Sequence, residues 1–531
     1  MRRAHVSEPL AAQSAAWPRL RFEPSPWKFP QQTHLSVLHA CRPESDPSSA
    51  YGTTGVVVSL QRSALYIGGQ WVAPHSTQIN HVVSASTEQP LGQTPLGDAH
   101  DIDAAVTAAR GSAWPLLTPD ERADAMEALA KAIEARAPEL ATTVSAENGM
   151  PIKLSAAANV FLPVALLRYY AQLARDFAWQ ENRPSPGGSS TRVVREPVGV
   201  VGAIVPWNYP QALAMMKIAP ALAAGCTVVL KPAPETALDA VLLADAAEAA
   251  RLPAGALNIV PGTADAGKAL VSHPGVGKIA FTGSTRTGRH IAQECGQMLR
   301  PVTLELGGKS AAVILDDADI DATASALADV SFPNNGQTCY ASTRVLAPRQ
   351  RYADVVEALT DIAATLHVGD PLVPTTDIGP LVSAEQRRQV ERFISLGKVQ
   401  GARLTTGGRR PAHLERGWYL EPTVFADVDN GMTIAQEEIF GPVLAVIPYD
   451  NEHHAVALAN DSKYGLAGSV WTTDRERGAA IASRMQTGTV GVNGYRLDLT
   501  SPFGGHKASG LGQELGPEGL QAYLTYKSVY L

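Results

Sequence analysis

Residues 278–308 have the sequence KIAFTGSTRTGRHIAQECGQMLRPVTLELGG, and their pattern indicates the fold class. It begins with a short apolar run, continues with a segment whose apolar residues recur at helical spacing, and ends with a second apolar run, VTLELGG. Short apolar strands that alternate with helices are typical of βαβ units in a buried parallel sheet. Ligands of such sheets bind beyond the carboxyl ends of the strands. We therefore expect an α/β fold in which glycine-rich strand ends face a ligand.

The same alternation extends in both directions from this stretch. Upstream, strand-like runs at 227–232 and 257–262 alternate with helical patterns at 235–251 and 265–273. Further elements are predicted where the apolar period is clear, namely a hairpin at 65–72, helices within 101–141, and strands at 344–348, 445–450, 466–473 and 520–531. The last of these, LQAYLTYKSVYL, is predicted to be an edge strand.

Length, charge and cysteine content exclude several classes of protein. A chain of 531 residues is too long for one ordinary core, so two or three domains are expected. The net charge of -7 and the pI near 6.0 give no electrostatic reason to expect nucleic acid or an anionic membrane as a partner. The four cysteines show no metal-ligand spacing and are too few for a disulfide framework, so a reducing cytoplasm is the expected location.

Two segments bear on targeting. The longest apolar run, VGVVGAIVP at 198–206, is shorter than the ~20 residues that a membrane helix needs. Residues 1–60 are rich in Pro, Ser, Arg and Gln without a clear period, and no continuous apolar segment follows the two N-terminal arginines. We expect a disordered N-terminal extension, or upstream sequence translated from a wrongly assigned start, and no secretory signal.

Cys339 lies in the run NNGQTCYAS, among small and amide-bearing residues. A structural cysteine usually has aliphatic neighbours, whereas a nucleophilic one needs hydrogen-bond donors, which these amides would supply, and room for a substrate. The run therefore favours a nucleophile, with a structural thiol as the alternative. Glu305 precedes two glycines at a predicted strand end, where it is either a solvated rim residue or a general base whose pKa is raised by desolvation.

Four loops carry weaker signals for ligand binding. In FTGSTRTG, Gly283 and Ser284 open a predicted helix whose N-terminus suits a phosphate, although many such turns bind nothing. Lys231 ends an apolar strand, where it either extends to the rim or binds a cofactor hydroxyl or phosphate. In PWNYP, Asn208 is either part of a rigid aromatic turn or an oxyanion donor.

The fourth loop is EEIFGPV, at 437–443. It is either a loop with one packed aromatic ring or a carboxylate and aromatic pair, Glu438 and Phe440, that binds a ribose. His453 and His454 have the pattern of surface helix residues, so no metal site is predicted.

In combination, these motifs resemble the aldehyde dehydrogenase superfamily. PWNYP, VVLKPAPET, FTGSTRTG, LELGGKS, NNGQTCYASTR, EEIFGPV and PFGGHKASGLGQELG occur in the family's order and at similar spacings, and the resemblance covers about residues 65–531. It implies a Rossmann-type cofactor domain at 61–178 and 198–304 and an α/β catalytic domain at 305–510. It also implies a small β-flap for oligomerisation from 179–197 and 511–531, in a homodimer or homotetramer.

The resemblance implies a role for each site residue. Cys339 would be the nucleophile, Glu305 the general base, and Asn208 the oxyanion donor beside the Cys339 backbone N–H. The residues with implied roles in binding NAD are Lys231 and Glu235 at the adenine ribose, Gly283 and Ser284 at the pyrophosphate, Glu438 at the nicotinamide ribose, and Trp207 and Phe440 at the nicotinamide.

Two departures from the family pattern affect specificity. Many NAD-preferring members have a carboxylate three residues after the lysine, where this chain has Pro234 followed by Glu235. NAD is therefore expected, with NADP as the alternative if Arg286 reaches a 2′-phosphate. The residues expected to line the substrate tunnel are mostly apolar, namely Leu213, Met216, Thr338, Tyr340 and Phe503.

We therefore expect an NAD(P)-dependent, non-acylating aldehyde dehydrogenase that acts on a medium-sized apolar or aromatic aldehyde. Four alternatives remain open. Arg496 near the tunnel would favour a charged semialdehyde, and a CoA-acylating enzyme would not need Glu305 as a hydrolytic base. A cofactor-free cysteine hydrolase would need a histidine partner for Cys339, and none stands out in the sequence. A non-catalytic protein with this fold would not need to retain Cys339, Glu305 and Asn208.

Overall fold

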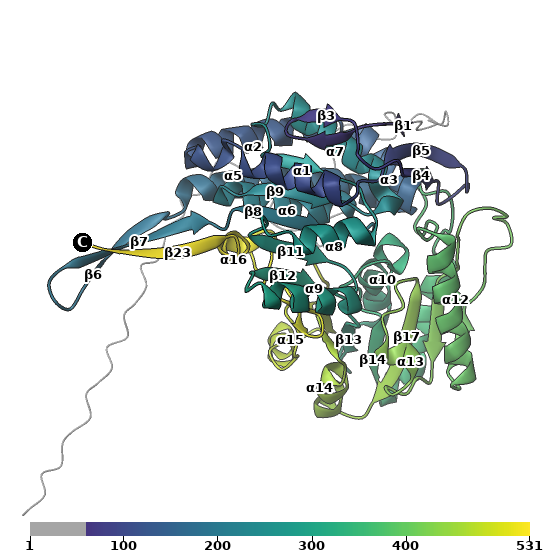
Figure 1. Cartoon of the computed structure of the whole chain (residues 1–531). Coiled ribbons are helices and arrows are strands. Elements are labelled where there is room, and N and C mark those ends of the chain that lie inside the picture. Colours follow the sequence, from purple (N-terminus) through teal and green to yellow (C-terminus); the bar gives the residue numbers. More distant parts are fainter. Residues whose placement is uncertain (1–59) are drawn as a thin grey trace, which may run out of the picture.

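The computed structural model describes residues 60–531 (Figure 1). The predicted disordered extension therefore lies outside the described residues, except for Leu60, which belongs to β1 (Leu60–Gln61). Strand β1 pairs with β5 (Pro90–Pro95), which also pairs with β4 (Ile79–Val83), and these form a small three-stranded sheet.

The first large sheet has eight strands in the order β22-β12-β11-β8-β9-β10-β2-β3. Their bounds are β2 Leu65–Ile67, β3 Gln70–Val72, β8 Val200–Ile204, β9 Thr227–Lys231, β10 Leu257–Ile259, β11 Lys278–Thr282, β12 Val302–Glu305 and β22 Gly510–Leu511. The five strands from β12 to β10 are parallel, which confirms the sheet predicted from 227–308. The predicted hairpin is also confirmed, because β2 and β3 pair antiparallel across two glycines with positive φ.

Helices cover both faces of this sheet because its strands are apolar on both sides. Val228 and Leu230 of β9 pack with α2 (Pro119–Glu134), α3 (Ala137–Asn148), α5 (Leu162–Asp176), α6 (Pro210–Ala224) and α7 (Ala237–Ala249). Val229, between them, packs with α1 (Ala99–Arg110), α8 (Ala264–Ser272) and α9 (Thr285–Gln297) on the other face. The start signal before α2 is confirmed, since Thr118 and Glu121 form a capping box.

The second large sheet has seven strands in the order β15-β16-β17-β14-β13-β19-β20. Their bounds are β13 Ala311–Ile314, β14 Arg344–Pro348, β15 Arg403–Thr406, β16 Thr423–Ala426, β17 Val443–Tyr449, β19 Gly468–Trp471 and β20 Gly491–Val492. All pair in parallel except β15, so this part is a second α/β layer, as predicted. Its faces are covered by α10 Ile320–Ser331, α11 Tyr352–Thr365, α12 Ala384–Val399, α13 Thr433–Gln436, α14 Glu452–Asn460 and α15 Arg475–Ala482.

Three strands form an arm that extends away from the rest of the protein (Figure 1). These are β6 (Gln180–Pro184), β7 (Ser190–Pro197) and β23 (Leu524–Tyr530), in the order β23-β7-β6. The C-terminal segment is thus an edge strand, as predicted. It follows α16 (Gly516–Gln521), and the short strands β18 (Tyr464–Gly465) and β21 (His506–Lys507) form a separate pair.

One continuous helix has the length and apolar composition to cross a membrane. It runs over Ile152–Asp176 and comprises α4 (Ile152–Ala156), a π-helical turn (Ala157–Phe161) and α5. Half of its apolar window is buried inside the protein. Because the buried side chains of α5 join the core cluster beneath the first sheet, the helix has the packing of a core helix.

Candidate active site

The loop that carries Cys339 is forced into a sharp turn between α10 and β14. Asn334, Asn335 and Gly336 have consecutive φ values of 50°, 61° and 75°, in the left-handed region. A Cβ on Gly336 would lie 2.2 Å from the Gly441 carbonyl oxygen, so only glycine fits there. The turn leaves Cys339 partly exposed, whereas Cys226 and Cys295 are buried.

The amide side chains before Cys339 hold this loop in place. The Asn335 amide donates to the carbonyl oxygens of Gly149 and Pro380 at 2.9 and 2.8 Å. The Gln337 side-chain oxygen accepts from the Val382 N–H at 2.9 Å. The interpretation that these amides supply donors to a substrate is therefore wrong, because their hydrogen bonds go to the backbone and position the turn.

Asn208 lies beside the Cys339 loop and is 3% exposed. Its Nδ2 donates to the Gln337 carbonyl at 3.0 Å, and its own carbonyl accepts from the amides of Asn148 at 3.1 Å and Asn334 at 2.9 Å. Asn148 also donates to the Trp207 carbonyl at 3.2 Å. These three hydrogen bonds fix Asn208 against the loop, and among the described residues its side-chain amide donates only to the Gln337 carbonyl.

Glu305 ends β12, where it pairs with Thr282 of β11 and Gly510 of β22. Its side chain is buried, and neither carboxylate oxygen has a hydrogen-bond partner among the described residues. Burial raises the pKa of Glu305 well above its ordinary value, and Glu514 raises it further, while Lys217 lowers it. A buried carboxyl with a raised pKa is a stronger base than an exposed one, which suits the role of a general base.

A buried ion pair lies close enough to Glu305 to affect its pKa. The Lys217 Nζ lies 2.8 Å from a Glu514 oxygen and donates to the Thr282 hydroxyl at 2.6 Å. Sequence reasoning missed both charged residues. The signal for Lys217 was a single lysine in the apolar helix α6, in which every residue is buried. Glu514 lies 297 residues further along the chain, and nothing in the sequence indicates that it pairs with Lys217.

The surroundings of Cys339 favour the neutral form of its thiol. Burial raises its pKa, and the nearby carboxyls of Glu438 and Glu305 raise it further. The Cys339 carbonyl lies against Gly308, where a Cβ would come within 2.4 Å of that oxygen. The glycines after Glu305 thus allow the Cys339 loop to approach the end of β12 closely.

The predicted adenosine-binding residues meet at the end of β9. The Lys231 ammonium donates to the carbonyls of Pro232 at 2.9 Å and Gly262 at 2.7 Å, and burial lowers its pKa to about 8. Glu235 is exposed, and its carboxylate lies close enough to Lys231 to raise the pKa of the ammonium, against the effect of burial.

Gly283 and Ser284 form the turn between β11 and α9, as predicted. The Gly283 N–H donates to the Glu305 carbonyl at 3.0 Å, which joins this turn to the end of β12. Ser284 is the N-cap of α9, and its hydroxyl accepts from the Thr287 N–H. The N-terminus of this 13-residue helix suits a pyrophosphate, so the turn fits the predicted role.

Glu438, Phe440 and Trp207 also come together. A Glu438 oxygen accepts from the Gly308 N–H at 3.0 Å, and burial raises the pKa of Glu438 to about 7. A Cβ on Gly307 would lie 2.4 Å from the other oxygen, so the carboxylate occupies a cradle that requires glycine. The rings of Phe440 and Trp207 meet edge to face, with centroids 5.4 Å apart. These groups fit a ribose and a flat nicotinamide ring.

Three of the predicted substrate residues, Leu213, Met216 and Phe503, are buried in the large core cluster beneath the first sheet, and Cys339 and Tyr340 pack against the same cluster. Two tyrosines that sequence reasoning missed complete the surroundings: the Tyr209 hydroxyl lies 2.9 Å from the buried Thr338 hydroxyl, and Tyr495 stacks on Tyr340 with ring centroids 5.0 Å apart.

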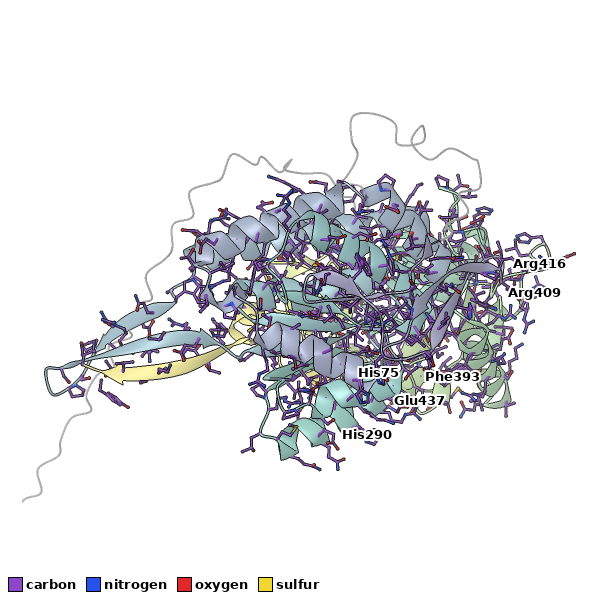
Figure 2. All side chains as sticks on the ribbon, turned by 45° about the horizontal axis from the view of Figure 1, so that its top comes forward. His75, His290, Phe393, Arg409, Arg416 and Glu437 are labelled. Atoms are coloured by element: carbon purple, nitrogen blue, oxygen red, sulfur yellow. The ribbon has the colours of Figure 1, made fainter. Side chains whose placement is uncertain are left out.

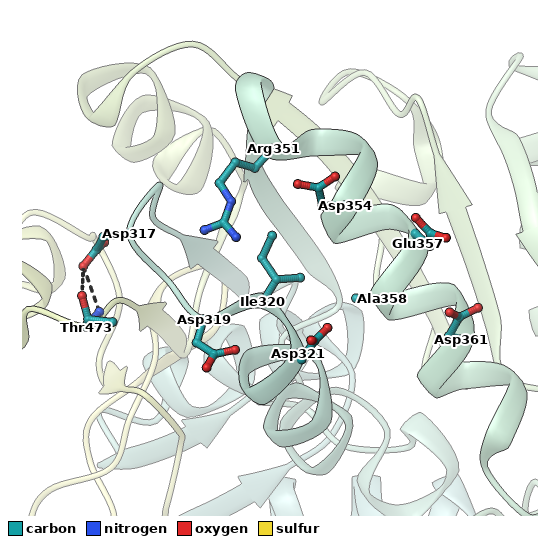
Figure 3. Close-up of a pocket in the computed structure, with 10 residues that line it drawn as sticks. All are labelled: Asp317, Asp319, Ile320, Asp321, Arg351, Asp354, Glu357, Ala358, Asp361 and Thr473. Carbon is teal, nitrogen blue, oxygen red and sulfur yellow. Dashed lines mark hydrogen bonds between the residues drawn. The ribbon is translucent and has the colours of Figure 1, made fainter.

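A separate hollow of about 590 Å³ lies between α10 and α11 (Figure 3). Its lining is acidic, including Asp319, Asp321, Asp354 and Asp361, with Arg351 as the one basic residue drawn there. None of the predicted site residues lines it, so it is distinct from the site around Cys339.

Comparison with known proteins places these features in one family. Residues 71–529 match the aldehyde dehydrogenase family. The chain is 53% identical over 478 residues to geranial dehydrogenase from Castellaniella defragrans, covering 89% of this chain and 100% of that protein. It is 43% identical over 474 residues to a putative aldehyde dehydrogenase from Bacillus subtilis, covering 88% of this chain and 95% of that protein.

Solved structures of aldehyde dehydrogenases have the same fold as this chain. An aldehyde dehydrogenase from Mycobacterium tuberculosis complexed with NAD+ has a TM-score of 0.86 and 48% identity, covering 89% of this chain and 99% of that chain. A mutant of aldehyde dehydrogenase C from Pseudomonas syringae, solved with NAD+ and octanal, has a TM-score of 0.85 and 39% identity, covering 90% of this chain and 98% of that chain. The protein belongs to the aldehyde dehydrogenase family.

Proposed function

We propose that this aldehyde dehydrogenase oxidises a medium-sized apolar or aromatic aldehyde to the carboxylic acid through a Cys339 thioester, with NAD⁺ as the cofactor. The observation that carries the proposal is the meeting of three groups from distant segments. Asn208 is clamped to the Cys339 loop, and the unpartnered carboxyl of Glu305 lies close enough to raise the pKa of the thiol.

The first step forms a bond between the Cys339 sulfur and the aldehyde carbon. The thiol loses its proton to solvent, which reaches the partly exposed Cys339, and this leaves Glu305 unprotonated for the later step. The carbonyl oxygen becomes an oxyanion, which accepts from the free N–H of Asn208 and from the Cys339 backbone N–H. Loss of one such donor typically lowers the rate by roughly 10²–10³-fold.

The second half of the reaction releases the acid. Bound NAD⁺ would accept a hydride from the former aldehyde carbon, and that carbon would then be held as a thioester on Cys339. Glu305 then removes a proton from water, the water oxygen attacks the thioester carbon, and the bond to sulfur breaks. The buried and unpartnered state of Glu305 supports this role, because a raised pKa makes a stronger base.

The residues that would hold NAD lie at the end of β9, at the start of α9 and beside Gly307 and Gly308. Lys231 would bind the adenine ribose, Ser284 and the start of α9 the pyrophosphate, and Glu438 the nicotinamide ribose between Gly307 and Gly308. The NAD+ complexes of the Mycobacterium tuberculosis and Bacillus cereus enzymes support NAD. The exposed carboxylate of Glu235 near Lys231 also favours NAD, since it would repel a 2′-phosphate.

The substrate class rests on the apolar surroundings of Cys339. Leu213, Met216 and Phe503 offer no charge to a substrate. Arg496, the residue that would favour a semialdehyde, is exposed and interacts with Asp498. The name geranial dehydrogenase of one relative, and the octanal bound to another, support an apolar aldehyde.

We also propose that the arm joins copies of the chain and that each large sheet marks a functional unit. Tyr526, Val529 and Tyr530 are exposed apolar residues on β23, whose outer edge has no partner strand among the described residues. Residues 61–178 and 198–304 would bind cofactor, and 305–510 would carry the chemistry. Analytical ultracentrifugation of Tyr530→Asp tests the first part, with a shift toward monomer expected.

Product analysis separates this proposal from its main alternative. The full chain is supplied with octanal and NAD⁺, with and without CoA, and the products are identified by mass spectrometry. Octanoic acid and reduced NAD in equal amounts, unaffected by CoA, are expected. Octanoyl-CoA as the main product in the presence of CoA would instead identify an acylating enzyme.

A further inference from the structure

Two histidines and an aspartate meet on the protein surface at the start of α1. The His75 Nδ1 lies 2.8 Å from one Asp98 oxygen, and the His100 Nδ1 lies 3.8 Å from the other. The two imidazole rings stack with centroids 4.1 Å apart and an angle of 27° between their planes. One potential ligand atom from each of the three residues lies within 4.8 Å of the others.

The backbone that carries these side chains is fixed. Asp101 is 4% exposed, and its carboxylate accepts from the N–H of His75 at 2.7 Å and of Asp98 at 3.0 Å. Asp98 in turn caps α1 by accepting from the His100 and Asp101 N–H groups. The Gly97 N–H donates to the Pro261 carbonyl at 2.8 Å. Residues 75 and 98–100 are therefore held together before any ligand arrives.

The side chains, by contrast, are free to adjust. The His75 and His100 side chains are 60% and 74% exposed, and His75 is labelled in Figure 2. In a tetrahedral zinc site with bonds of about 2.1 Å, neighbouring ligand atoms are roughly 3.4 Å apart. The observed separations, 2.8 Å from His75 to one Asp98 oxygen and 3.8 Å from His100 to the other, are within about 0.6 Å of that value.

The ligand chemistry indicates which ion fits. Imidazole nitrogens with one carboxylate oxygen suit Zn²⁺, Ni²⁺ or Cu²⁺ rather than Mg²⁺ or Ca²⁺, which prefer oxygen ligands. Three protein ligands leave at least one position for water. The positive end of the α1 dipole opposes a cation, and the Asp98 carboxylate, which lies at the same end, offsets this effect.

We propose that His75, Asp98 and His100 form a surface site for a divalent transition-metal ion, separate from the chemistry at Cys339. A bound ion would cross-link the loop before β4 to the start of α1. Because the ion binds the folded arrangement, occupancy stabilises the protein against unfolding. The sequence did not predict this site, since His75 and His100 are 25 residues apart in the chain and show no ligand spacing.

Isothermal titration of the full, tag-free chain with Zn²⁺ tests the proposal. The titration uses the Cys339→Ala background, so that the thiol contributes nothing. His75→Ala, His100→Ala and Asp98→Asn each remove a ligand, and asparagine preserves the helix cap. His453→Ala, which removes an exposed histidine on α14, is the matched control.

The expected result is a one-to-one site whose affinity falls at least roughly tenfold in each ligand variant and is unchanged in His453→Ala. Zn²⁺ is also expected to raise the thermal midpoint of the background protein but not of His75→Ala. Equal zinc affinity in the background protein and in both histidine variants would overturn the proposal. Neither result depends on turnover, so the test is independent of the proposed enzymatic function.

Discussion

Lys217 and Glu514, which are 297 residues apart in the chain, form an ion pair of 2.8 Å whose side chains are 0% and 1% exposed. The pair lies beside Glu305, whose pKa responds to both partners in opposite directions. Removing one partner of a buried pair leaves an uncompensated charge, which typically costs about 3–5 kcal/mol. The pair therefore links the folding of α6 and the C-terminal region to the environment of Glu305.

Lys217→Met is expected to reduce the free energy of unfolding by about 3–5 kcal/mol, because the buried Glu514 loses the ammonium that lies 2.8 Å from its carboxylate. Urea denaturation measures the loss. Lys268→Met is the control, since Lys268 pairs with Asp265 while both are largely exposed, and such pairs contribute about 0–1 kcal/mol. Similar losses in the two variants would contradict a special role for the buried pair.

Asn148→Ala is expected to lower kcat by roughly 10–100-fold, because Asn208 loses one of the two amides that hold its carbonyl. Steady-state kinetics provide the measurement. Asn258→Ala is the matched control, since its buried amide also donates to two carbonyls, those of Val228 and Gly255, away from Cys339. If Asn258→Ala lowers kcat as much as Asn148→Ala does, the effect is general destabilisation and not the position of Asn208.

Glu305→Gln is expected to slow thioester hydrolysis more than hydride transfer, because glutamine keeps the shape of the side chain and cannot accept a proton from water. Stopped-flow absorbance should then show a burst of reduced NAD followed by a slow phase, with the slow phase at least ~10²-fold below the wild-type rate. Equal slowing of both phases would show that Glu305 is not the base for hydrolysis.

The pH dependence follows from the raised pKa of the Cys339 thiol. Burial favours the neutral thiol, so the thiolate fraction is small at neutral pH and increases as pH rises. We expect kcat/KM to increase between about pH 6 and pH 9, up to tenfold per pH unit. A kcat/KM that is constant or falls over this interval would mean that thiol deprotonation does not limit the reaction.

Local patterns in the sequence predicted the parts of the structure that depend on neighbouring residues. The alternation around 227–308 predicted the parallel strands β9 to β12, because a strand buried on both faces must be apolar throughout. The resemblance brought Cys339, Glu305 and Asn208 into one site, and the structure places them near one another. Their catalytic roles stay predictions.

Long-range hydrogen bonds could not be predicted in this way. Lys217 was a visible anomaly in an apolar helix, but its partner Glu514 is nearly 300 residues away. The amides of Asn335 and Gln337 looked like substrate donors from composition, yet Asn335 donates to the carbonyls of Gly149 and Pro380 in distant loops, and Gln337 donates to the nearby Asn334 carbonyl. A polar residue type indicates that a hydrogen bond must form, but only the fold determines with which atom.

The most direct test of the account is the rate of cofactor reduction by the full chain and by Cys339→Ala. Each is supplied with NAD⁺ or NADP⁺ and with octanal, citral, benzaldehyde or a short charged semialdehyde. We predict rapid NAD⁺ reduction with the apolar aldehydes by the wild type, and none by Cys339→Ala although it still binds NAD⁺. Appreciable turnover by Cys339→Ala would contradict the role of the nucleophile, and a wild-type preference for the charged semialdehyde would contradict the proposed substrate class.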